Sequence, residues 1–145
     1  MRKYYLFIIK NDFYDIYRNN ANILYITLEN IYHLSNDDFI YGISIYNQLC
    51  QTFNTEIIKN YFINKNNKYI RKIGKQFFIN DIYARQKTCL QINHSCIVLK
   101  TSCNIPYALR IFNLYNKNIF VCDFDNKDYF WLKDYSINKR NYSYC

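Results

Sequence analysis

The chain has 145 residues, of which half are hydrophobic and 20% aromatic, and its formal net charge is +8. This composition excludes a disordered protein, and the length predicts one domain that needs no disulfide or metal to fold. The excess positive charge favours anionic partners such as nucleic acid, acidic protein surfaces or membrane headgroups. AT-rich codons also produce an abundance of Asn, Ile, Lys and Tyr, so part of that charge reflects the genome rather than a dedicated site.

The start of the chain lacks the features of a secretory signal, because its apolar run stops at Ile9 without a small-residue cleavage site. No apolar stretch reaches the ~20 residues of a membrane span. We therefore expect a cytoplasmic protein with reduced thiols and no membrane contact. The six cysteines form no Cys-x-x-Cys pair, and the histidines are only His33 and His94. This favours buried thiols over a zinc site, and we expect neither a metal nor a cofactor.

A nearly continuous apolar run over 3–10 predicts a strand that is buried on both faces. Asn11 suits the N-cap of a following short helix, which fades around 18–20. Phe13 and Tyr17 are one turn apart and share one face of this helix. Such an aromatic pair is either a core anchor or a docking patch.

Apolar residues at helical spacing predict two further helices, over 22–33 and roughly 36–50. Ser35-Asn36-Asp37-Asp38 resembles a capping box at the start of the second. Residues 55–64 fit either a strand or a helix, and a polar turn follows at 64–67.

The second half of the chain is dominated by strands that are joined by short turns. We expect strands over 68–72, 76–83, 88–92, 96–100, 119–124 and 129–132, with turns at Gly74, 93–95 and 125–128. A helix begins at 102–106 with Pro106 in its first turn, and it buries Leu109, Phe112 and Leu114.

The mixture of helices and hairpins predicts an α+β fold. We expect a two-layer single domain over 1–137, in which helices pack on a mixed or antiparallel sheet. Residues 138–145 form a polar C-terminal tail.

No constellation of catalytic residues stands out, so we expect a protein that is not an enzyme. His33 and His94 have no recognisable nucleophile or acid partner, and two glycines exclude the usual phosphate-binding loops. Asp123 and Asp125 are spaced as in some metal-dependent nucleases, but the further carboxylates around a metal are missing. We interpret both as turn-forming residues of a hairpin.

Two blocks of sequence lie near the two ends of the chain. The first is Tyr4-Tyr5 through Ile8-Ile9-Lys10, followed by Phe13 and Tyr17. The second is Asp123-Phe124, followed by Tyr129 and then Trp131-Leu132. Their order, their separation and the chain length resemble the SirA family, the sporulation inhibitors of replication of low-GC Gram-positive bacteria. The middle third of the chain does not share this resemblance.

The resemblance implies a non-enzymatic protein that binds the N-terminal domain of the replication initiator DnaA and blocks initiation at the chromosome origin. It implies that Phe13 and Tyr17 contact the initiator and that a second contact lies near Asn47 and Gln48. The family continues with Asn-Pro after Trp-Leu, whereas Lys133-Asp134 follows here.

Trp131 itself is expected in the core, because a tryptophan in a terminal hairpin strand is more often buried than in contact with a partner.

The alternative is a small basic nucleic-acid-binding module. The segment 65–77 interleaves positive charge with aromatic rings, as a surface for phosphates and stacked bases does. Its candidate binding residues are Lys68, Tyr69, Arg71, Lys72 and Lys75. Salt dependence separates the two hypotheses, because binding to nucleic acid weakens steeply with salt.

Overall fold

The computed structural model describes residues 1–34, 39–64, 70–81, 85–93, 95–103, 106 and 108–135. Within them, five helices accompany one antiparallel sheet of eight strands, which confirms the α+β class. The helices are α1 (Asn11–Tyr17), α2 (Ala21–Tyr32), α3 (Phe39–Leu49), α4 (Thr55–Asn64) and α5 (Leu109–Tyr115). The strands are β1 (Arg2–Ile9), β2 (Cys50–Gln51), β3 (Ile70–Ile73), β4 (Gln76–Asp81), β5 (Gln86–Ile92), β6 (Ile97–Thr101), β7 (Ile119–Asp123) and β8 (Asp128–Trp131).

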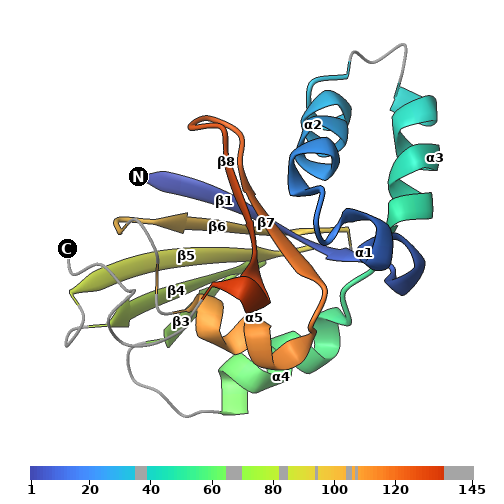
Figure 1. The fold of residues 1–145 in the computed structure, drawn as a ribbon. Coiled ribbons are helices and arrows are strands. Elements are labelled where there is room, and N and C mark those ends of the chain that lie inside the picture. The colour runs from blue at the N-terminus through green and yellow to red at the C-terminus, as the bar shows by residue number, and fades with distance from the viewer. Residues whose placement is uncertain are drawn as a thin grey trace.

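The N-terminal strand β1 lies inside the sheet, between β6 and β7 (Figure 1). The strand order is β3-β4-β5-β6-β1-β7-β8, and β2 pairs with the end of β1. Leu6 pairs with Ile97 on one side and with Val121 on the other. Pairing between β1 and β7 brings the N-terminal strand next to residues 119–123, which are far from it in the sequence.

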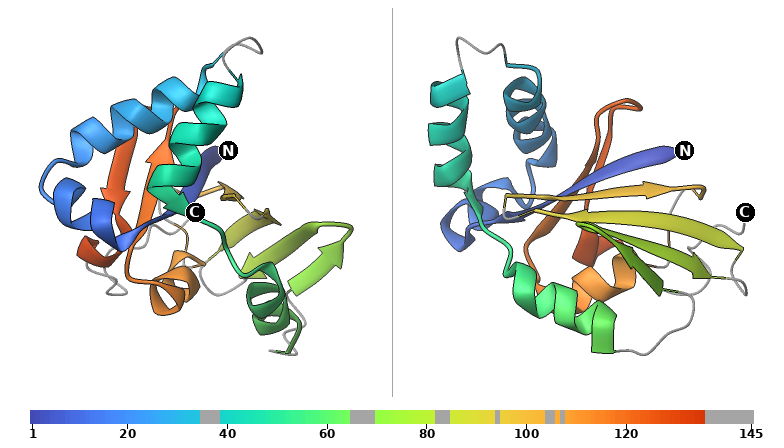
Figure 2. Two further views of the ribbon diagram at one scale, coloured as in Figure 1. Left: turned by 90° about the vertical axis from the view of Figure 1, so that its right-hand side faces the viewer. Right: turned by 180° about the vertical axis from the view of Figure 1, so that it is seen from behind.

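Helices cover both faces of the sheet, α4 and α5 on one and α1, α2 and α3 on the other (Figures 1 and 2). Successive side chains of a strand point to opposite faces. In β1, Leu6 and Ile8 therefore join the core under α4 and α5, while Phe7 and Ile9 join the core under α2 and α3. The expectation that this strand is buried on both faces is confirmed. Because helices cover both faces of the sheet, the structure has one layer more than the two-layer arrangement that was expected.

The core under α4 and α5 shows which apolar residues of these two helices are buried. Residues 55–64 form a helix, and Ile58 and Phe62, one turn apart, are two of its buried side chains. In α5, Leu109 and Phe112 are buried, but Leu114 is 77% exposed. The expectation that Leu114 is buried was wrong, because two residues after Phe112 the helix has turned about 200° away from the core. The helix begins at Leu109, after the buried Pro106.

The start of α1 differs in detail from the expected cap. Lys10 is the N-cap, without a side-chain capping hydrogen bond. The side chain of Asn11 instead accepts a hydrogen bond of 2.5 Å from Asn118 Nδ2, which also donates to the Ile9 carbonyl. The predicted capping box at 35–38, the turn at 64–67 and the tail at 138–145 lie outside the described residues.

Most of the described cysteines are free thiols. Cys50, Cys89, Cys96 and Cys122 are free, and burial raises the pKa of Cys50 to about 12. Cys103 is disulfide-bonded, so the prediction of reduced thiols was wrong for this residue. No helix in the described ranges has the length and apolar character needed to cross a membrane.

Candidate functional site

Helix α1 is held in place by Tyr14. The Tyr14 ring packs edge-on against Trp131, with 4.9 Å between ring centroids, and Lys133 Nζ lies 4.2 Å from the centroid of the same ring. The backbone N–H of Tyr14 donates to the Lys10 carbonyl at 2.8 Å, which fixes the first turn. The charge of Lys133 thus covers an aromatic ring. Tyr14 is not among the site residues predicted from the sequence.

With Tyr14 turned inward, Phe13 and Tyr17 lie on the flank of the helix. Both side chains are partly buried and pack at the edge of the core under α2 and α3. Ile16, which lies to one side of this pair on the helix, is 57% exposed. Aromatic side chains that are packed at their base and accessible at their tip are typical of binding hot spots.

The other two predicted contact residues, Asn47 and Gln48, are exposed in the last turn of α3. Lys10 ties this turn to the start of α1. Its Nζ donates to the Asn47 carbonyl at 2.6 Å, and its backbone N–H donates to the Leu49 carbonyl at 2.9 Å. The first turn of α1 and the last turn of α3 therefore meet at one corner of the molecule.

We call the outer surface of α1, α2 and α3 the helical face. Large hydrophobic side chains are exposed on all three helices: Ile16, Ile23, Ile26, Tyr32 and Ile43. Asp12 and Asp15 are exposed in α1. An exposed apolar and aromatic surface suits a protein partner whose own surface is apolar.

Asp123 closes the turn between β7 and β8. Its buried carboxylate accepts hydrogen bonds from Asn126 Nδ2 at 2.7 Å, from the Asn126 N–H at 3.1 Å and from Arg2 Nε at 2.8 Å. Arg2 also pairs with the exposed Asp128 at 2.9 Å. These contacts support the interpretation of Asp123 as a turn-forming residue. In the described ranges, no three His, Cys, Asp or Glu side chains come together as a metal site.

These contacts predict an acid-sensitive fold. Burial alone would raise the pKa of Asp123, but hydrogen bonds from Asn126 and Arg2 outweigh it and lower the pKa below its ordinary value. The stabilisation is therefore complete above the unfolded-state pKa of about 3.9 and is lost as the pH falls through the lower folded-state pKa. We expect Asp123→Asn to lower the free energy of unfolding at pH 7 by about 2 kcal/mol and to flatten its acid dependence. Urea denaturation at pH 7 and pH 3 measures both, with Asp128→Asn as an exposed control. Unchanged acid dependence in Asp123→Asn would contradict this assignment.

The basic segment does not form one surface. Lys68 and Tyr69 lie outside the described residues. Arg71 pairs in register with Phe78, on the face of the sheet away from α4 and α5, whereas Lys72 pairs with Phe77 on the opposite face. Lys72 Nζ lies 6.0 Å from the Phe77 ring centroid. Lys75 is exposed in the β3–β4 turn, beside Gly74, whose φ of 62° suits glycine.

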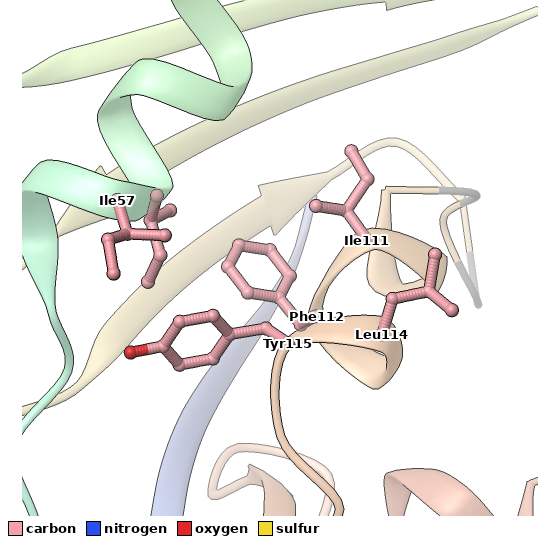
Figure 3. Close-up of a pocket in the computed structure, with 6 residues that line it drawn as sticks. Ile57, Ile111, Phe112, Leu114 and Tyr115 are labelled. Atoms are coloured by element: carbon pink, nitrogen blue, oxygen red, sulfur yellow. The ribbon is translucent and has the colours of Figure 1, made fainter.

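A cavity of about 120 Å³ lies between α4 and α5 (Figure 3). It is lined by Ile57, Ile58, Ile111, Phe112, Leu114 and Tyr115. The Tyr115 hydroxyl already accepts a hydrogen bond from the Asn54 N–H at 2.9 Å. The lining brings no acid, base or nucleophile together, and the volume is below the roughly 300 Å³ at which small-molecule sites begin. We assign no catalytic role to this cavity.

The helical face is thus the surface on which the predicted partner-binding residues gather. No protein-family model matches the chain, and no curated protein matches it at a significant level.

Proposed function

We propose that this protein binds the N-terminal domain of DnaA through its helical face and thereby inhibits the initiation of chromosome replication. In this proposal it acts in the cytoplasm, needs no cofactor and catalyses no reaction. Inhibition is steric, because the bound protein occupies the surface through which the DnaA domain assembles or recruits partners.

The meeting of α1 and α3 carries the proposal. Phe13 and Tyr17 come from the first helix, and Asn47 and Gln48 come from the third, yet the bonds of Lys10 hold the start of α1 at the end of α3. A partner that covers this corner contacts both groups at once. Stable protein interfaces bury about 800 Å² on each partner, so a binding surface must combine residues from several elements.

A second feature supports the proposal. The two sequence blocks behind the SirA resemblance form one unit, in which β1 pairs with β7 and Tyr14 of α1 packs on Trp131 of β8. The blocks thus combine the binding helix with the part of the sheet that positions it. A departure from the family at Lys133 leaves this unit intact, since Lys133 packs on Tyr14.

Titration of the wild-type protein with the isolated DnaA N-terminal domain tests the proposal. We expect saturable binding that weakens less between 50 and 200 mM salt than the roughly 10³-fold or greater loss of a nucleic-acid binder with many phosphate contacts. Circular dichroism of both proteins establishes that they are folded. Absence of saturable binding between the folded proteins would overturn the proposal.

A further inference from the structure

Charge is divided unequally between the two halves of this fold. From Ile57 to Cys122 the sequence contains eleven Lys or Arg residues and one acid, Asp81. The rest of the chain contains eight Lys or Arg residues and ten acids. The basic stretch includes β3, β4, β5 and β6, so one wing of the sheet is strongly positive. Such asymmetry is typical of proteins that bind polyanions.

None of the helices that the structure describes covers one face of this wing. Phe77, Leu90 and Leu99 point into the core under α4 and α5, so the alternate side chains of β4, β5 and β6 point the other way. Figures 1 and 2 show α2 and α3 over the β1–β7–β8 part of the sheet and no helix over β4, β5 and β6 on that side. We call this uncovered side of β3–β6, together with Lys3 at the start of β1, which pairs with Lys100, the open face.

Strand register aligns charged and aromatic side chains across the open face. Arg71 pairs with Phe78, Phe78 with Cys89, Cys89 with Lys100, and Lys100 with Lys3. This row crosses four strand-to-strand spacings, or about 19 Å. It places a cation at each end and the 38% exposed Phe78 ring beside one of them.

The two neighbouring rows of the open face add a further cation and several amide side chains. Asn80 pairs with Lys87, and both are exposed. On the other side of the Phe78 row, Gln76 pairs with Gln91, and these amides donate and accept hydrogen bonds. Among the open-face side chains that the structure describes there is no carboxylate, so nothing there offsets the charges of Arg71, Lys87 and Lys100.

We infer that the open face binds single-stranded nucleic acid, with phosphates on Arg71, Lys87, Lys100 and Lys3 and a base stacked on Phe78. A sheet surface with an exposed aromatic ring suits an unstacked base, as it does in other sheet-based binders of single strands. A second copy of the chain is a poor occupant, because it would place like charges against each other. The surface is separate from the helical face, and the inference does not depend on DnaA binding.

Fluorescence-anisotropy titrations with labelled oligo(dT), oligo(U) and a duplex of equal length test this inference. We expect the single strands to bind more tightly than the duplex, and the comparison of oligo(dT) with oligo(U) shows whether DNA or RNA is preferred. Phe78→Ala should weaken binding by about 5- to 150-fold, the range measured for loss of one stacked base, while Phe78→Tyr retains it. Lys100→Ala should reduce the slope of log K against log salt by about 0.7.

Lys117→Ala is the matched control, because Lys117 is exposed just before β7 and outside the open face. It removes the same charge as Lys100→Ala and should leave the salt slope unchanged. Thermal melting establishes that every variant is folded. The inference fails if no oligonucleotide binds, if Lys117→Ala and Lys100→Ala have equal effects, or if poly-glutamate binds equally well and Phe78→Ala has no effect.

Discussion

Trp131→Ala is expected to lower the free energy of unfolding by about 3–5 kcal/mol, the usual cost of removing a large buried aromatic side chain. Trp131 is 4% exposed. Its ring packs edge-on between Phe120, 4.8 Å away, and Tyr14, 4.9 Å away by ring centroids. The substitution therefore opens a cavity between β7, β8 and α1, which the surrounding backbone can fill only in part.

Urea denaturation measures this loss, and Trp131→Phe is its control. The Trp131 Nε1 atom is buried and has no hydrogen-bond partner among the described residues. Phenylalanine therefore keeps an aromatic ring in the core without the cost of a broken hydrogen bond. We expect its destabilisation to be less than half that of alanine. Equal stability of Trp131→Ala and the wild type would show that the packing of α1 on the sheet is not as described.

Tyr17→Ala is expected to weaken binding to the DnaA N-terminal domain by about 30-fold or more, which corresponds to the ~2 kcal/mol that defines a hot spot. Tyr17 packs at the edge of the core and is accessible on the helical face. Truncation removes the accessible part of the ring and leaves Tyr14, which anchors α1, in place. Isothermal titration calorimetry of the variant and the wild type gives the change in affinity.

Two substitutions control for effects on the fold. Tyr17→Phe keeps the ring and should bind within a few-fold of the wild type. Leu114→Ala removes a 77% exposed side chain from α5, on the opposite face of the sheet, and should not change the affinity. If the folded Tyr17→Ala variant binds with wild-type affinity, DnaA remains the proposed partner, but Tyr17 is not part of the binding site. Trp131→Ala cannot replace these variants in the binding test, because it also disturbs the packing of Tyr14 that supports α1.

Local pattern was enough to predict the strand β1 and the hairpins. The continuous apolar run at 3–10 matches a strand that contributes to two cores. The error at Leu114 arose because an apolar residue was assigned to the core by type rather than by its angle on the helix. Tyr14 was overlooked for the opposite reason, since its partner Trp131 is far away in the sequence.

Features that depend on contacts between residues far apart in the sequence could not be predicted from the local sequence pattern. The meeting of α1 with α3 rests on the two bonds of Lys10, and neither is encoded in the spacing of nearby residues. Strand alternation split the predicted basic patch, placing Arg71 and Lys72 on opposite faces. The open-face row requires the register of five strands, which only the assembled sheet defines.

Hydrogen exchange of this protein, alone and saturated with the DnaA N-terminal domain, tests most directly whether the helical face is the docking surface. Amides that are covered or stabilised by a partner exchange more slowly. We predict slower exchange in α1 and in the last turn of α3 and unchanged exchange in β3, β4 and β5. Slower exchange confined to the open face or to α4 and α5, with α1 unaffected, would contradict the account.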